Sequence, residues 1–161
     1  MNIIIKKRFL LYKDYKFKCS IGKAGVKKNK IERDSATPQG IFSLGKIYYR
    51  NDKIKKINTN LSCKKIKKNM GWCNDPKNIK YNKEVNRKKI KNSEKLFRND
   101  DKYDAFIVIN YNSKPIIKNK GSAIFIHLTK NYKSTAGCIA IKKKHFLKLA
   151  ELINKKTRIK I

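Results

Sequence analysis

The chain of 161 residues is long enough to fold as one domain that buries about two-thirds of the surface its unfolded form exposes. Hydrophobic residues make up 40% of the chain, which favours a folded protein over a disordered one. The 43 Lys and Arg against 11 Asp and Glu give a formal net charge of +32, and so strong a field attracts polyanions of any kind.

The distribution of this charge argues against nucleic acid as the partner. Of the 43 basic residues, 37 are Lys and 6 are Arg, whereas base-edge readout and bidentate phosphate recognition favour Arg. The lysines are spread from Lys6 to Lys160 and form no single stripe. We interpret most of them as a solvated surface coat, with an anionic substrate or polymer surface as the alternative.

Short strand patterns dominate the chain, and one helix pattern stands near its end. A helix is predicted from about Lys143 to Asn154, because its apolar residues recur at i, i+3, i+4 and i+7. Many short strands with one late helix predict a mainly β fold with minor α: a β-sandwich or curved mixed sheet with the helix packed outside, in a single domain over residues 1–161. The predicted strands, in chain order, are NIII, RFLLY, YKFKCSI, GIFSLGKIYY, AFIVINY, AIFIHLT, GCIAI and TRIKI.

The apolar runs and the cysteines of the chain set further expectations. The opening MNIIIKKRFLLYKD interrupts its apolar run at Lys6, which leaves it too short for a signal peptide, and no later run is long enough to span a bilayer. Cys19, Cys63, Cys73 and Cys138 form no CxxC pair, which argues against a zinc ribbon or finger, and we expect neither a metal nor a cofactor. A disulfide between Cys63 and Cys73 stays open.

The middle of the chain, residues 51–104, is thin in apolar residues and rich in Lys and Asn. A polar insertion of this length in a compact domain is usually a functional loop or disordered. It nevertheless carries the only tryptophan, Trp72, in the run GWCNDP, and a large aromatic side chain favours docking of at least part of it. Two interpretations stay open: a substrate-covering active-site flap that includes Trp72, and a surface excursion pinned by this residue.

The run GSAIFIHLTKNYKSTAGCIAI, residues 121–141, places a histidine and a cysteine beside two apolar alternating segments. Because side chains alternate across a strand, His127 and Cys138 both point away from the branched aliphatic residues of their own strands. If the two strands are neighbours, His127 can lie across from Cys138, and directly opposed residues have Cβ atoms about 4.5–5.5 Å apart. The pair is then either a nucleophile with its base or a core histidine beside a core thiol.

An imidazole beside a thiol has a known chemical use. A free thiol with a pKa of about 8.5 is only a few per cent thiolate at neutral pH, and a neighbouring imidazole can lower that pKa by several units. We therefore expect His127 to lower the pKa of Cys138. His145, at the start of the predicted helix, is the rival base, although its position suits a capping or surface residue better.

The residues before the cysteine predict a sharp turn. Ala136 and Gly137 are small enough to let the backbone turn just before Cys138, which leaves amide N–H groups free to face a developing oxyanion. Ser134 and Thr135 are candidate supports, since their hydroxyls can hydrogen-bond within the turn.

Three motifs resemble one family. IFIHL followed by STAGCIAI resembles the signature of the L,D-transpeptidase catalytic-domain (YkuD) family, a histidine closing one strand and a Ser/Thr-x-Gly-Cys turn entering the next. ATPQGIF resembles the family's Thr-Pro-x-Gly-x-Phe segment. GWCNDP, the pair Tyr81–Asn82 and SEKLFRNDDKYD resemble its compact, single-domain bacterial branch. The matches extend from about Ile21 to Ile141 in the expected order.

The resemblance implies cysteine-dependent acyl transfer on peptidoglycan stem peptides. Cys138 would attack the carbonyl of the third stem residue, a diamino acid, at its bond to a terminal D-alanine, and His127 would act as general base and then acid. Backbone N–H groups of Gly137 and Cys138 would form the oxyanion hole. Transfer of the thioester to an amine gives a cross-link, and transfer to water gives carboxypeptidase-like trimming. The resemblance also implies a cell-envelope or periplasmic location, and we expect a monomer.

The chain departs from the family pattern at three points. Ala136 stands where members commonly carry a second histidine, Ala140 stands where they tend to have Arg or Asn, and the interval from His127 to Cys138 is shorter than usual. One base suffices chemically, so the roles of His127 and Cys138 are unaffected. The residues that hold the substrate carboxylates and the choice between amine and water stay open. The rival from another class is a non-catalytic basic module that binds nucleic acid or wall polymer.

Overall fold

A computed structural model describes all residues, 1–161. Each predicted strand is present, and the helix predicted from about Lys143 to Asn154 spans Lys143–Leu152. The elements are β1 (Asn2–Lys6), β2 (Phe9–Tyr12), β3 (Tyr15–Ser20), β4 (Val26–Lys27), β5 (Thr37–Pro38), β6 (Ile41–Tyr49), β7 (Cys63–Lys65), β8 (Met70–Trp72), β9 (Glu84–Asn86), β10 (Glu94–Lys95), the short 3-10 helix η1 (Asp101–Tyr103), β11 (Ala105–Ile109), β12 (Phe125–Leu128), β13 (Ile139–Ile141), α1 (Lys143–Leu152) and β14 (Arg158–Lys160).

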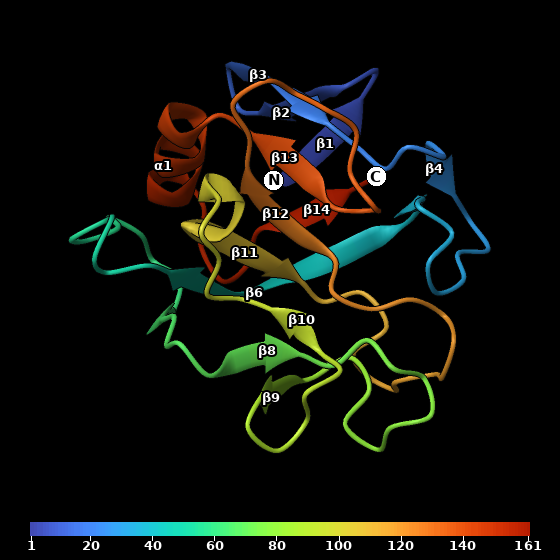
Figure 1. Ribbon diagram of the computed structural model, residues 1–161. Coiled ribbons are helices and arrows are strands. Elements are labelled where there is room, and N and C mark those ends of the chain that lie inside the picture. Colours follow the sequence, from blue (N-terminus) through green and yellow to red (C-terminus); the bar gives the residue numbers. More distant parts are fainter.

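The long strands form one mixed, curved sheet that closes on itself. Its strand order is β11-β12-β13-β3-β2-β1-β14-β6-β7, and a further pairing of β11 with β6 closes the ring, from which β7 extends as an additional strand beside β6. The pairs β1–β14, β12–β13 and β6–β7 are parallel, whereas the other neighbours in this sheet are antiparallel. The mainly β fold with one α-helix is therefore confirmed, in its curved mixed-sheet form (Figure 1).

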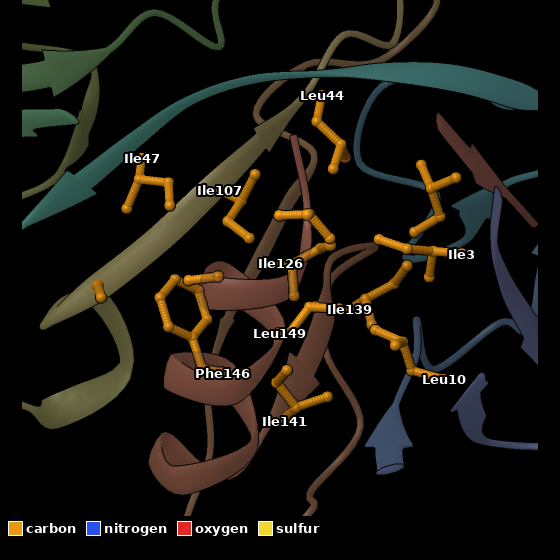
Figure 2. Close-up of a cluster of buried hydrophobic side chains, with 14 of the residues drawn as sticks. Ile3, Leu10, Leu44, Ile47, Ile107, Ile126, Ile139, Ile141, Phe146 and Leu149 are labelled. Carbon is orange, nitrogen blue, oxygen red and sulfur yellow. The ribbon is translucent and has the colours of Figure 1, made fainter. Parts of the chain in front are cut away.

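The main core fills the concave side of this sheet. It contains the aliphatic residues of one alternation phase, among them Ile107, Ile126 and Ile139, which are fully buried. Helix α1 packs its apolar face, including Phe146 and Leu149, into the same cluster (Figure 2). Full burial of each such side chain contributes about 1.5–3 kcal/mol, so this cluster fixes β11, β12 and β13 relative to one another.

A second core lies on the opposite face of the same strands. Phe106 and Phe125 stack at 4.5 Å between ring centroids and are covered by the polar middle segment, which contributes Trp72, Leu96 and Tyr103. This segment contains the small antiparallel sheet β10-β8-β9, which Figure 1 shows below the main sheet. Some apolar residues of the segment therefore dock it over the strand that carries His127, whereas Ile54, Ile57 and Leu61 join the main core.

The structure contains no helix with the length and apolar character that a membrane crossing requires.

Candidate active site

His127 and Cys138 come from neighbouring strands that run parallel. His127 lies in β12 opposite Ala140 of β13, and Ile126 lies opposite Ile139. Cys138 precedes β13, at the level of Phe125, whose N–H donates to its Sγ at 3.4 Å. The strands are neighbours as expected, but the register offsets His127 from Cys138 by two residues, so the two are not directly opposed. Residues 129–138 carry the chain back before β13 begins, and the pairing of aliphatic residues in the core then sets the register.

Both side chains nevertheless lie on one face and open into one cavity. Residues two apart along a strand share a face, so His127 and the residue level with Cys138 point the same way. His127 and Cys138 both line a cavity of about 520 Å³. Thr135 and Ser134 also line it, whereas Tyr103 enters its wall from the middle segment. The thiol and the imidazole are therefore accessible to the same ligand.

His127 is held as a neutral base. The side chain is 6% exposed, and its Nδ1 lies 2.9 Å from the carbonyl oxygen of Leu128. Since a carbonyl oxygen can only accept, Nδ1 carries the proton and Nε2 presents a lone pair. Tyr103 packs against the imidazole edge to face, with ring centroids 5.5 Å apart. Burial lowers the pKa of His127 to about 4, so the ring is neutral at physiological pH.

Cys138 is a neutral thiol in this structure. It is 9% exposed, and its Sγ donates to the carbonyl oxygen of Ala123 at 3.2 Å. Burial raises the pKa of Cys138 to about 12, and the nearby Glu94 carboxylate adds to the increase. The expectation that His127 lowers this pKa is wrong, because a buried neutral imidazole supplies no positive charge. A nucleophilic role for this sulfur would then require that it lose its proton during the attack and not beforehand.

The turn before Cys138 is fixed by Thr135. The Thr135 hydroxyl donates to the carbonyl oxygen of Cys138 at 2.6 Å and accepts from the N–H of Gly137 at 3.1 Å. Ser134 makes no such side-chain hydrogen bond. The N–H of Cys138 has no partner within the chain, whereas that of Gly137 is engaged by Thr135. Of the two amides expected to face an oxyanion, that of Cys138 is free.

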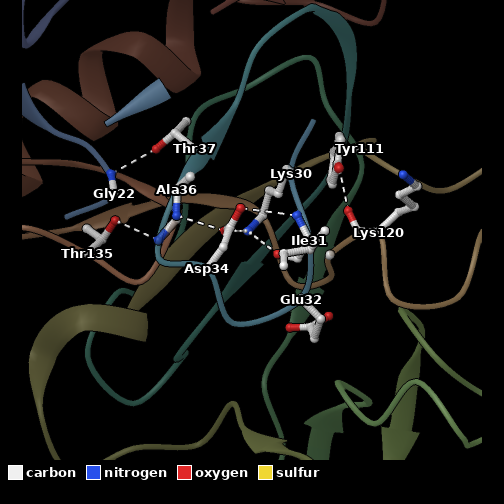
Figure 3. Close-up of polar contacts among 12 residues, drawn as sticks. Gly22, Lys30, Ile31, Glu32, Asp34, Ala36, Thr37, Tyr111, Lys120 and Thr135 are labelled. Atoms are coloured by element: carbon white, nitrogen blue, oxygen red, sulfur yellow. Dashed lines mark hydrogen bonds and ion pairs between the residues drawn. The ribbon is translucent and has the colours of Figure 1, made fainter. Parts of the chain in front are cut away.

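The ATPQG run packs against this turn, with Ala36 close to Gly137. Gly137 has φ +139°, and a Cβ at this position would lie 2.8 Å from the carbonyl oxygen of Ala36. The Asp34 carboxylate accepts from Ala36 N–H at 2.9 Å and pairs with the buried Lys30 at 2.6 Å (Figure 3). Only glycine fits the close approach at residue 137, which explains why the two motifs occur together.

Trp72 and Asn82 hold Ala123, which lies just before β12 and whose carbonyl oxygen accepts a hydrogen bond from the Cys138 thiol. Trp72 is 8% exposed, and its Nε1 donates to Asn82 Oδ1 at 2.9 Å. The same oxygen accepts from Ala123 N–H at 3.0 Å, and the carbonyl of Ala123 receives the Cys138 thiol. The docking of Trp72 is therefore confirmed, although this residue does not line the cavity of about 520 Å³.

Three of these residues were missed as individual site residues: Asn82, Tyr103 and Glu94. Asn82 has φ +54°, a conformation that Asn tolerates better than most residues, but isolated polar residues in a polar segment carry no periodic signal. His145, the rival base, stacks on Phe17 at 4.9 Å and is not part of the cavity. All four cysteines are free thiols, so the disulfide that the sequence left open is not formed.

A thiol, a correctly tautomerised imidazole and a free amide at one cavity are the groups that acyl transfer through a thioester requires. The family model described as the L,D-transpeptidase catalytic domain, YkuD, matches residues 3–161. The chain therefore belongs to this family, whose members are generally cysteine-dependent L,D-transpeptidases that act on peptidoglycan and are typically associated with the cell envelope. No curated protein and no solved structure matches the chain.

Proposed function

We propose that this protein transfers an acyl group from a peptidoglycan tetrapeptide stem to an amine, through a thioester on Cys138. The observation that supports the proposal best is the cavity that His127 and Cys138 line together, with Nδ1 of His127 occupied by the Leu128 carbonyl and Nε2 left as the basic nitrogen. The family's activity on peptidoglycan supports the substrate class.

Acylation begins with the neutral pair. As Sγ of Cys138 attacks the carbonyl carbon of the third stem residue, Nε2 of His127 takes the thiol proton. The imidazolium then returns this proton to the nitrogen of D-alanine while the C–N bond breaks, which leaves a thioester and free D-alanine. The carbonyl of Leu128 keeps the ring oriented through both transfers. The unengaged N–H of Cys138 is the best-placed donor for the oxyanion, worth about 3–4 kcal/mol if it behaves like other such donors.

Charge around the cavity suits an anionic stem peptide. Arg33, Lys102 and Lys133 line it without ion-pair partners, whereas Lys30 and Arg98 are paired with carboxylates. The unpaired cations are candidates for the substrate carboxylates, a role that Ala140 cannot fill. Residues 51–104 supply part of the cavity wall, and we propose that they form a docked cover over the donor peptide.

We further propose that residues 1–161 act as one catalytic domain, as a monomer, and in the cell envelope or periplasm where peptidoglycan lies. These proposals rest on the single family match over residues 3–161 and on the substrate class.

Product analysis tests the function. The purified protein is incubated with disaccharide tetrapeptides, and the products are separated and weighed by mass spectrometry. Release of D-alanine together with dimers supports transfer, release with monomeric tripeptides indicates hydrolysis, and intact tetrapeptide contradicts both. Cys138→Ala should abolish all products, while Cys63→Ala, which removes an exposed thiol far from the cavity lining, should leave them unchanged.

A further inference from the structure

Two carboxylates face the catalytic cavity of a chain with a net charge of +32, and neither has a cationic partner. Glu32 and Glu94 line the cavity that contains Cys138 and His127. Seven of the other nine acidic residues form ion pairs, as Glu84 does with Lys64 at 2.9 Å, and the two exceptions are Asp14 and Asp75. Neither Glu32 nor Glu94 forms a salt bridge. A carboxylate that lacks an ion-pair partner keeps its capacity to form charge-assisted hydrogen bonds with a cationic group.

Tyrosine hydroxyls hold both carboxylates in place. Tyr81 donates to Oε2 of Glu32, and Tyr103 donates to Oε1 of Glu94. The second oxygen of each carboxylate has no hydrogen-bond partner in the chain. Arg98, the nearest guanidinium to Glu94 in the cavity wall, is occupied by Asp100, to which its Nε donates at 3.0 and 3.1 Å. Both carboxylates are therefore held by hydroxyl groups and not by cations, and burial raises the pKa of Glu94, which favours its taking a proton from a bound ammonium group.

Glu94 also lies where two cavities meet. A second, wholly polar cavity of about 690 Å³ shares Glu94, Arg98, Arg33 and Asn74 with the catalytic cavity. A reaction between two peptides needs two approaches to one thioester, and this arrangement provides them on either side of Glu94. Independently, Ser122 in the catalytic cavity is 7% exposed and its hydroxyl has no hydrogen-bond partner, which marks a polar group left for a ligand.

We propose that Glu94, with Glu32 beside it, binds the ammonium group of the acceptor stem peptide that enters through the second cavity. The inference rests on the proposed function, and it assigns the acceptor as a primary amine in preference to water. Glu94 is the closer of the two to the reaction, because Tyr103 connects it to His127: the phenol donates to Glu94, and the ring packs on the imidazole.

The transfer step balances with these groups. The bound ammonium gives one proton to the Glu94 carboxylate, and the resulting amine attacks the carbonyl carbon of the thioester. As the C–S bond breaks, the nitrogen loses its second proton to Nε2 of His127, which passes it to the Cys138 thiolate. Glu94 then releases its proton to water, and the products are an amide cross-link and the restored thiol.

The test measures how the thioester partitions between amine and water. Glu94→Gln keeps an oxygen that can accept from Tyr103 but removes the charge. Glu84→Gln is the matched control, because Glu84 also accepts from a tyrosine, Tyr48 at 2.8 Å, and lies outside both cavities. Acylation is followed as the first-turnover release of D-alanine, and partition as the ratio of dimer to free tripeptide over a range of acceptor concentrations.

We expect Glu94→Gln to lower the dimer-to-tripeptide ratio about 10- to 100-fold, the loss of one charge-assisted hydrogen bond. This ratio is set after the thioester has formed, so it is read independently of any change in first-turnover acylation, to which the Glu94 charge also contributes through the pKa of Cys138. Hydroxylamine, an amine that is uncharged at pH 7, provides a second acceptor: its capture of the thioester should be the same in wild type, Glu94→Gln and Glu84→Gln. A merely structural role for Glu94 would lower both captures together.

The outcomes separate the two proposals. No D-alanine release by the wild-type protein contradicts the proposed function itself. If the wild type acylates, an unchanged dimer ratio in Glu94→Gln, an equal loss of acylation and transfer, or a wild type that yields only tripeptide each overturns the assignment of Glu94 and leaves the proposed thioester chemistry intact.

Discussion

Replacement of Asn82 by alanine tests whether the Trp72–Asn82–Ala123 chain holds the active site together. Asn82 is 8% exposed, and its Oδ1 accepts from Trp72 Nε1 at 2.9 Å and from Ala123 N–H at 3.0 Å. Its Nδ2 donates to the carbonyl oxygens of two residues in the neighbouring loop. Asn82→Ala therefore leaves two buried donors without acceptors.

The expected cost can be worked out from these contacts. Each buried donor that loses its acceptor costs about 1–3 kcal/mol, so the two together cost about 2–6 kcal/mol. Alanine at φ +54° adds a further cost of about 1–2 kcal/mol for the left-handed conformation. A chain of this kind is stable by about 5–15 kcal/mol in total, so the variant should remain folded only at low denaturant concentration.

Asn119→Ala provides the matched control. Asn119 has φ +65°, is exposed, and makes no side-chain hydrogen bond, so its replacement reports the backbone cost alone. Urea unfolding followed by tryptophan fluorescence measures the free energy of unfolding. We expect this free energy to be about 2–6 kcal/mol lower for Asn82→Ala than for Asn119→Ala. Equal free energies of unfolding for the two variants would refute the reasoning and show that the Asn82 contacts contribute nothing net.

Three further measurements check the site. Burial lowers the pKa of His127 to about 4, so about 90% of the imidazole is neutral at pH 5, against about 3% for an ordinary histidine. Single-turnover acylation should therefore persist down to a pH near 4. A loss of acylation with an apparent pKa near 6.5 would contradict this. Asp34→Asn leaves the buried Lys30 charge without its ion-pair partner and should lower the free energy of unfolding in urea by about 3–5 kcal/mol. The exposed control Glu151→Gln should lower it by less than about 1 kcal/mol. Iodoacetamide should label exposed Cys63 before the neutral, buried Cys138, and the reverse order would show an activated resting thiol.

Secondary structure could be predicted well because in this chain it follows from patterns among neighbouring residues. Alternation in runs such as AIFIHLT and the i, i+3, i+4, i+7 spacing of α1 each depend on neighbouring residues alone. The closure of the sheet could not be predicted in the same way. It depends on the pairing of β11 with β6 and of β1 with β14, and these contacts join segments that are far apart in sequence.

The shared face of the candidate site residues could be predicted from the sequence, but the energetics of the site could not. Alternation correctly separated His127 and Cys138 from the aliphatic core, and the Thr135 hydroxyl holds the turn as expected. The parallel register and the high pKa of Cys138 follow from tertiary burial, which no local pattern reveals. Residues 51–104 were expected to dock at least in part through Trp72, but the polarity of the segment gave no sign that docking would place Tyr103 and Glu94 at the cavity.

Covalent capture of the donor tests the central claim most directly. The protein is mixed with a disaccharide tetrapeptide, quenched in acid after a single turnover, weighed intact and then mapped by proteolysis and mass spectrometry. We expect a thioester on the peptide that contains Cys138. The added mass should equal that of the donor without its D-alanine, and the adduct should be absent from His127→Ala at the same time point. A folded wild-type protein that shows no adduct, or one that carries it on Cys19, Cys63 or Cys73, would contradict it.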